Sequence, residues 1–396
     1  MTVLTGLDPW SHHVRDHNWA LPSGIPLLSE RLKSAGYDTA AVVPSATLRE
    51  EFGFSRGFDF WSNGHYGHDV VTSPAMTGQA LQWLSLRRAA RDARPWFLWI
   101  HFWDPHYNYL PPSPYDQSFP SQWRPAPGTR FDMTELKNHE APLRPQETAF
   151  LRTQYEGEIL YTDRYLADLL DFVEQAWGGE KTLIVLVGDH GEAFQEHGWL
   201  THTIRVHEEM IHVPLVLRWP GHLPGGARHE EPVSLASVTP TILEALGLES
   251  PAGAFDGAGL WHGARGGGAP SAAGALPIVS ETIRGASLSA LRDGSWKYIL
   301  DMNACTGTLF DLAADPGEAH DLAAAEPERA AAMRSALLAF YRDNPRAAAT
   351  KPEPMPEESD EDLELLRSLG YIGATTRDRF GDAVTFAGRT DPGNCR

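Results

Sequence analysis

The segment Thr182-Leu-Ile-Val-Leu-Val-Gly-Asp-His-Gly-Glu192 decides the fold. Its apolar run, residues 182–187, is bounded by glycines on both sides, which is typical of a buried parallel strand. Open α/β sheets bind ligands at the carboxyl ends of their strands, and Asp189 and His190 lie at this end. A carboxylate beside an imidazole is half of a divalent-metal site, although such a pair taken alone also fits a turn or a cap.

The residues that follow favour the metal-site interpretation. His197, His202, His207 and His212 fall within 16 residues, and an apolar strand ending in a Pro-Gly turn follows at 213–221. Four histidines between two strands are hard to explain by packing alone. The chain therefore concentrates metal- and proton-binding side chains at one edge of the predicted sheet.

A set of motifs gives this region a family resemblance. Asp-His-Gly-Glu at 189–192 is followed by Glu-His-Gly at 196–198, Glu-Glu at 208–209 and Val-Pro-Leu-Val-Leu-Arg-Trp-Pro-Gly at 213–221. In this order and spacing they resemble the sulfatase family, which belongs to the alkaline-phosphatase superfamily of metal-dependent ester hydrolases. Matching segments cover most of the chain, among them Leu-Thr-Gly at 4–6, Gly-Phe-Asp at 57–59, Asp-Pro-His at 104–106 and Leu-Gly-Tyr-Ile at 369–372. The resemblance implies an α/β fold, with an alkaline-phosphatase-like mixed sheet flanked by helices and a small C-terminal α+β subdomain.

The resemblance also implies a reaction and a cofactor. A nucleophilic side chain attacks a sulfuric ester, while a metal neutralises the ester oxygens. Asp189 and His190 are the expected metal ligands. Many sulfatases carry Asn at the position of His190, which suits Ca²⁺, whereas an imidazole suits Mn²⁺ or Zn²⁺ better. Relatives with Asp-His include phosphate and phosphonate ester hydrolases, so that activity is the alternative.

Three further residues are expected at the site by resemblance. His106 matches a substrate-contacting histidine, and His202 lies near the position of a Lys or His that contacts the transferred group. Both are expected to be catalytic and to bind substrate, with Arg205 as an additional substrate-binding residue. The alternative for His106 is a loop histidine bonded to backbone. His101 is expected to be structural because it ends a buried strand, and His197 to shape its loop.

The nucleophile motif of the family is absent from this sequence. No Cys-x-Pro-x-Arg or Ser-x-Pro-x-Arg occurs, and the motif would lie immediately before Met1. The family's strand that ends in two metal-binding aspartates would lie further upstream. We expect this chain to be a fragment or to have a start assigned too late, and to be inactive as written. A non-catalytic remnant is the competing interpretation, although the lost strand would leave buried amides unpaired at about 1–3 kcal/mol each.

Composition limits the partners. A net charge of −19 argues against nucleic acid or an anionic membrane, which leaves a small-molecule or glycan sulfate or phosphate ester as the expected partner. No apolar stretch is long enough to cross a bilayer, and two cysteines predict no disulfide framework. The chain as written is expected in the cytoplasm, unless a signal peptide belongs to a missing N-terminus. The oligomeric state cannot be inferred.

Sequence composition divides the chain into four parts. Residues 1–248 alternate helical and strand patterns and form the expected catalytic α/β domain. Residues 249–276 are rich in Gly, Ala and Pro and predict a linker, and residues 346–396 begin with an acidic stretch that predicts a partly mobile tail. Between them, 277–345 predict three short strands and a helix over 327–342. In the first domain, helices are predicted over 81–93, 147–177 and 237–246.

Overall fold

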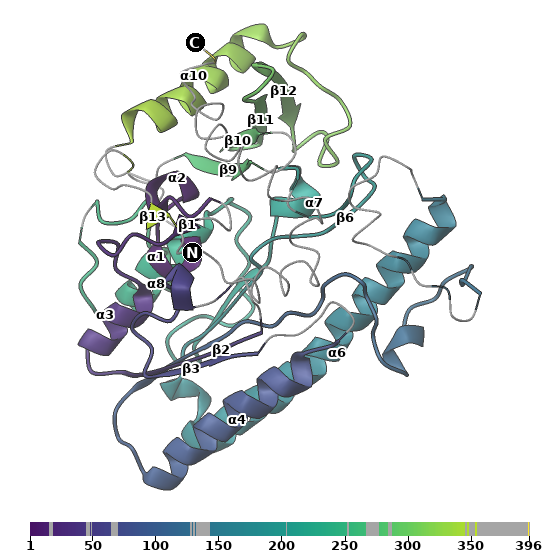
Figure 1. Cartoon of the computed structure of the whole chain (residues 1–396). Coiled ribbons are helices and arrows are strands. Elements are labelled where there is room, and N and C mark those ends of the chain that lie inside the picture. Colours follow the sequence, from purple (N-terminus) through teal and green to yellow (C-terminus); the bar gives the residue numbers. More distant parts are fainter. Residues whose placement is uncertain are drawn as a thin grey trace.

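A computed structural model describes residues 1–15, 19–44, 48, 50–64, 70–126, 129, 131, 143–202, 204–251, 253–266, 277–283, 287–344, 347, 353–354 and 395. It contains an α/β body and a second sheet with its own helix, which lie at opposite ends of the view in Figure 1. The predicted tail, 346–396, and the second half of the predicted linker lie almost wholly outside the described residues.

The centre of the body is a parallel sheet in the order β3-β2-β4. Its strands are β2 (Asp38–Val43), β3 (Phe60–Asn63) and β4 (Trp96–Ile100). Strand residues alternate between two faces, because successive side chains point to opposite sides. Trp96, Leu98 and Ile100 pack into one core, whereas Phe97 and Trp99 pack into another.

Helices cover both faces of this sheet (Figure 1). Two long helices, α4 (Ser73–Ala90) and α6 (Pro145–Trp177), lie side by side on one face with Met76, Leu84 and Leu169 in the core. The other face is covered by the short helices α1 (Thr2–Thr5), α3 (Leu28–Ser34) and α8 (Val238–Ala245). The end of α6 matches the predicted stop at Gly178. Helix α4 begins eight residues before the predicted start, at a Ser-Pro pair whose proline suits a first helical turn.

The strand that carries the metal motif is β5 (Ile184–Val187), and it pairs antiparallel with β8 (Leu215–Arg218). A parallel strand was predicted here, whereas β8, the one partner of β5 that the structure describes, is antiparallel to it. Val185 and Val187 pack into the same core as Phe97 and Trp99, so β5 continues the body. Leu186 and its cross-strand partner Val216 remain 38% and 52% exposed, since no described element covers their face of the pair.

Short connecting elements bring the histidine-rich segment together. Strands β6 (Ala193–Phe194) and β7 (Leu200–Thr201) form a hairpin, and helix α7 (Glu208–Ile211) follows it. The Gly191 amide donates to the Met210 carbonyl (2.7 Å), which fixes the turn after β5 against α7. A side chain at Gly191 would bring its Cβ to 2.2 Å from the Glu209 carbonyl oxygen, so this approach requires glycine.

The C-terminal unit is an antiparallel sheet in the order β12-β11-β10-β9 packed on helix α10 (Pro327–Asp343). Its strands are β9 (Ile278–Thr282), β10 (Leu288–Asp293), β11 (Trp296–Asp301) and β12 (Thr306–Asp311). Three strands and the helix were predicted, and the fourth strand was not. Within 249–276, the structure describes helix α9 (Trp261–Gly266), with Leu260 and Trp261 buried against the body. The remaining described elements are α2 (Pro9–His12), β1 (Trp19–Ala20), β13 (Glu353–Pro354) and the short 3₁₀ turns η1 (Glu50–Phe52), η2 (Tyr115–Gln117), η3 (Gly179–Lys181) and η4 (Leu235–Ser237).

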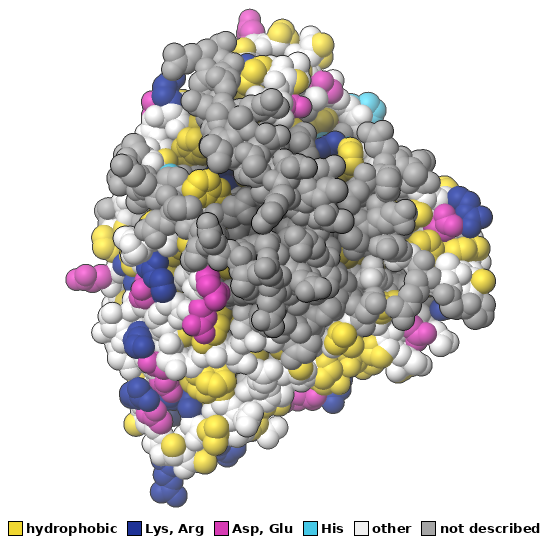
Figure 2. Space-filling model, viewed as in Figure 1, with side chains coloured by type: hydrophobic (Ala, Val, Ile, Leu, Met, Phe, Trp, Pro, Cys, Tyr) yellow, Lys and Arg dark blue, Asp and Glu magenta, His cyan; other side chains and the backbone are white. Residues whose placement is uncertain are grey.

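The described surface carries side chains of both charges. On the face shown in Figure 2, Lys, Arg, Asp and Glu side chains of the described residues are interspersed and do not gather into one basic patch. Among the described helices, none is both long and apolar enough to cross a membrane.

The two cysteines form a disulfide, Cys305–Cys395, which composition did not predict. It joins residues 90 positions apart and is buried at Cys395, whose carbonyl also accepts a hydrogen bond from Arg334. Replacing both cysteines by serine is expected to lower the free energy of unfolding by roughly 2–4 kcal/mol, because the cross-link restricts the unfolded chain. Urea unfolding of the double variant and of each single variant measures this. Equal stability of the double variant and the oxidised parent would contradict it.

Candidate active site

The predicted metal pair lies directly after β5. His190 Nδ1 donates to the Gly191 carbonyl (2.9 Å), so the neutral ring presents its lone pair at Nε2. That atom lies 3.7 Å from Asp189 Oδ2. A metal-binding histidine generally donates its other ring N–H to an oxygen in this way. The two residues therefore offer adjoining ligand atoms with the tautomer already set.

His101, which was expected to be structural, lies next to this pair. Its Nε2 lies 4.0 Å from Asp189 Oδ2. His101 follows β4 as Asp189 follows β5, so the two side chains meet at the same edge of the body. One carboxylate and two imidazoles suit Mn²⁺ or Zn²⁺ better than Ca²⁺, which prefers oxygen ligands.

The electrostatics keep Asp189 ionised. Burial by itself would raise the pKa of Asp189, but His190, His101 and His202 together hold that pKa well below its usual range. Its side chain is still 59% exposed, because it opens onto a cavity of about 1470 Å³. The cavity is also lined by His190, His202 and Arg205.

His202 lies against the metal pair. Its ring stacks on His190 with centroids 4.0 Å apart, and its Nδ1 lies 3.1 Å from Glu192 Oε1. Burial and the neighbouring His190 lower the pKa of His202, while Glu192 opposes that shift. Since Nδ1–H donates to the carboxylate, Nε2 is the atom at which His202 exchanges a proton. Sequence reasoning did not single out Glu192, which is buried.

His106 and Arg205 complete the predicted set. The His106 ring lies edge-on to His202 with centroids 5.3 Å apart, and its Nδ1 donates to the Tyr107 carbonyl (2.8 Å). The Arg205 guanidinium lies 4.2 Å from the ring centre of Trp199, at the cavity wall. Four of the five predicted residues, Asp189, His190, His202 and Arg205, line the cavity, and the fifth, His106, contacts the ring of His202.

A buried carboxyl group holds the loop that carries His106. Glu158, from α6, accepts hydrogen bonds from the backbone N–H groups of His106 (3.1 Å) and Leu110 (2.5 Å). Burial, together with the charge of Asp104, raises the pKa of Glu158 to about 8. Glu158 was missed because its partners are backbone atoms of a loop distant in sequence.

This raised pKa predicts a pH dependence of stability. Between the usual carboxyl pKa and about 8, Glu158 is protonated in the folded protein but ionised in the unfolded chain. Its contribution is therefore complete at low pH and is lost as pH rises to about 8, on the order of a few kcal/mol in all. We expect the stability difference between the parent and Glu158→Gln to fall over this interval, measured by urea unfolding from pH 5 to pH 8.5. A difference that stays constant or grows with pH would exclude the raised pKa.

One hydroxyl–imidazole pair at the cavity does not supply a nucleophile and its base. Thr2 Oγ1 lies 3.1 Å from His12 Nε2. The Val14 amide donates to His12 Nδ1 (3.1 Å), so the neutral ring carries its proton on Nε2 and donates it to Thr2. Burial keeps the pKa of His12 well below its usual value. His12 therefore cannot accept a proton from Thr2 in this arrangement.

Comparison with known proteins identifies the family. A profile of the sulfatase family matches residues 1–248. The chain belongs to the sulfatase family. Choline-sulfatase of Rhizobium meliloti (strain 1021) is 30% identical over an alignment of 298 positions that covers 67% of this chain and 53% of that protein. The chain spans about half the length of the curated relatives it matches.

Solved sulfatase-like structures share the fold. The structure of BT4656 in complex with D-glucosamine-2-N,6-O-disulfate superposes with a TM-score of 0.71 at 18% identity, covering 89% of this chain and 88% of that one. Phosphonate monoester hydrolase of Agrobacterium radiobacter gives a TM-score of 0.68 at 22% identity, covering 90% and 89%. The predicted α/β fold, a mixed sheet flanked by helices, is confirmed.

Proposed function

We propose that this sulfatase-family chain contributes the metal and proton-transfer side of a site that hydrolyses sulfuric esters. The observation that carries the proposal is the contact between the Asp189–His190 pair and His202, which is itself paired with Glu192. A metal-ligand pair beside a buried carboxylate–imidazole pair is the combination that ester cleavage needs.

Asp189 and His190 would hold the metal, with His101 close enough to join them. When bound, the ion would neutralise the non-bridging oxygens of the ester. The donor set favours Mn²⁺ or Zn²⁺ over Ca²⁺.

The neighbouring side chains would bind the ester and move a proton. His202 would exchange the proton of the leaving alcohol at Nε2, and Glu192 would stabilise its cationic form. His106, held by Glu158, would contact the ester from the opposite side of His202. Arg205, which lines the cavity beside the Trp199 ring, would attract the anionic group.

The sequence contains no family nucleophile motif, so hydrolysis is measured with two forms of the protein. The 396-residue chain and a version with any in-frame sequence upstream of Met1 are assayed on 4-nitrophenyl sulfate with Mn²⁺, Zn²⁺ or Ca²⁺. Metal-dependent cleavage by either form, lost in Asp189→Ala, is the expected result. Failure of both forms to cleave the ester would favour a non-catalytic remnant.

A phosphate or phosphonate ester is the second candidate substrate. Its support is the fold shared with phosphonate monoester hydrolase of Agrobacterium radiobacter, together with His190, which the resemblance does not restrict to sulfate chemistry. The same assays with 4-nitrophenyl phosphate and 4-nitrophenyl phenylphosphonate allow these two esters and 4-nitrophenyl sulfate to be ranked by kcat/KM. Preference for either phosphorus ester by about tenfold or more would replace the sulfate assignment.

The substrate class and compartment follow as extensions of this proposal. A cavity of about 1470 Å³ has room for a small-molecule ester or a short sulfated glycan. The disulfide favours an oxidising compartment over the cytoplasm, since such bonds persist mainly outside the cytosol. Thiol titration of the protein isolated from its source distinguishes the two, with no reactive thiol expected.

A further inference from the structure

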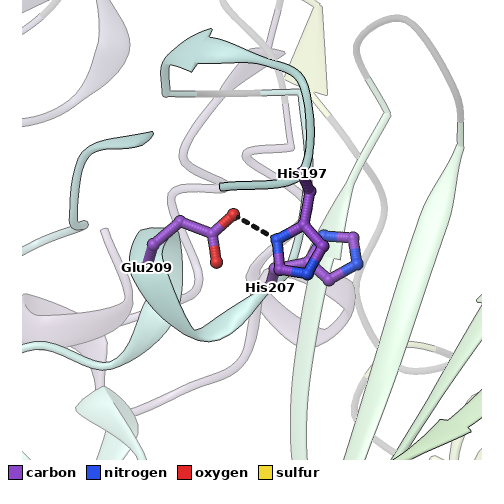
Figure 3. Close-up of side chains that lie close together, drawn as sticks. All are labelled: His197, His207 and Glu209. Atoms are coloured by element: carbon purple, nitrogen blue, oxygen red, sulfur yellow. Dashed lines mark hydrogen bonds and ion pairs between the residues drawn. The ribbon is translucent and has the colours of Figure 1, made fainter. Parts of the chain in front are cut away.

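A second group of potential ligands lies behind the active-site turn. His197, His207 and Glu209 bring one ligand atom each to within 4.8 Å of one another (Figure 3). His197 comes from the β6–β7 hairpin, His207 precedes α7 and Glu209 is in α7. None of the three contributes to the Asp189–His190 pair.

The contacts of His197 require a positive charge between its ring and the Glu209 carboxylate. Its Nε2 lies 3.3 Å from the Glu318 carbonyl oxygen, which can only accept, so Nε2 carries a proton. Its Nδ1 lies 2.8 Å from Glu209 Oε1, the contact drawn in Figure 3. A neutral ring would place a lone pair against a carboxylate oxygen, so a proton or a metal ion must lie between them.

His207 supplies the second observation. Its Nδ1 is buried and has no hydrogen-bond partner among the described residues. An orphaned buried nitrogen costs free energy unless it finds a partner.

We propose that His197, His207 and Glu209 form a second divalent-metal site, selective for Zn²⁺ or a similar transition metal, that ties the β6–β7 hairpin to α7. Two imidazoles and one carboxylate are a zinc ligand set, with water in the fourth position. The His197 and His207 rings are stacked, with centroids 3.9 Å apart and planes 15° from parallel. Binding therefore requires the His207 ring to turn about its side-chain torsions until its lone pair faces Glu209.

The site would act on two neighbouring features. The hairpin leads directly into His202, so a metal here would restrict the position of that residue. His197 also donates to Glu318, which forms an ion pair with the buried Lys297 of β11 at 2.8 Å. The metal would thus strengthen the contact between the body and the C-terminal sheet. The proposal does not depend on the proposed hydrolase activity.

Metal stoichiometry in variants of the full chain tests the site. The active-site pair is removed first, as Asp189→Ala with His190→Ala, so that the remaining binding reports only other sites. Co²⁺ absorption and calorimetry with Zn²⁺ are then expected to show one equivalent per chain. Adding His207→Gln, or separately Glu209→Gln, is expected to weaken Zn²⁺ binding at least about 100-fold and to remove the visible Co²⁺ bands.

A matched control separates this site from exposed histidines. His212 lies at the end of the same helix with an exposed side chain, and His212→Gln should leave the stoichiometry at one. Circular dichroism and metal-free Tm values verify that each variant folds, and a variant that fails to fold is replaced by the other substitution. Absence of this one equivalent from the chain that lacks the active-site pair, or its persistence in both His207→Gln and Glu209→Gln, would overturn the proposal.

Discussion

Asp189→Ala is expected to weaken Mn²⁺ binding at the active-site pair by at least about 100-fold. Asp189 is the carboxylate around which His190 and His101 gather, at 3.7 and 4.0 Å. The surrounding imidazoles hold the pKa of Asp189 low, so the carboxylate is ionised across the physiological range. Removing it leaves two imidazoles without a negative charge to offset the ion.

The measurement is calorimetry with Mn²⁺ in a His207→Gln background, which silences the proposed second site. His212→Ala serves as the control, because its side chain is exposed and its ion-pair partner is Glu208, which is not a proposed ligand. Asp189→Asn should lose less affinity than Asp189→Ala, because the amide oxygen still offers a ligand atom. Unchanged Mn²⁺ affinity in Asp189→Ala would place the metal elsewhere and remove the basis of the proposed hydrolysis.

The position of Asp189 and His190 at the end of β5 could be predicted because its information is local. An apolar run followed by Gly-Asp-His-Gly specifies a strand, its end and two candidate ligand side chains within 11 residues. The long helix α6 was predictable for the same reason, since its periodic apolar pattern ends at a glycine cap. Local patterns of this kind do not depend on contacts with distant parts of the chain.

His101 and Glu192 show where such reasoning stops. His101 lies at the end of an apolar strand, so sequence alone suggests packing, and its role depends on β4 and β5 ending at the same edge. That rule of sheet geometry was applied to Asp189 and could also have been applied to His101. Glu192 becomes a partner of His202 only through the β6–β7 hairpin, which is two residue pairs long and has no sequence signature.

Strand pairing and the disulfide were harder to predict than the contacts of single residues. The apolar run of β5 predicts burial, but its antiparallel partner β8 lies about 30 residues downstream and no local signal sets the direction. The Cys305–Cys395 pair is separated by 90 residues, and spacing carries no information about pairing over that distance. Strand β12 was missed because its alternating pattern is interrupted by a glycine that packs against the Tyr298 ring.

His202→Gln is expected to lower kcat by about 10²–10⁴-fold in whichever form of the protein hydrolyses aryl sulfates. The ring lies against both His190 and His106, and Glu192 fixes Nδ1–H so that Nε2 exchanges the proton. Gln keeps a polar group of similar length but cannot carry the proton. Glu192→Gln should have a smaller effect, because it removes only the charge that stabilises the imidazolium.

The leaving group distinguishes proton transfer from simple positioning. 4-Nitrophenolate departs without a proton, whereas an alkyl alkoxide does not. The loss in His202→Gln should therefore be larger for an alkyl sulfate, such as choline sulfate, than for 4-nitrophenyl sulfate, while His212→Gln changes neither. An equal loss for both esters would mean that His202 stabilises the non-bridging oxygens and that another group protonates the alcohol. No loss for either would remove His202 from the reaction and leave its contact with His190 as packing.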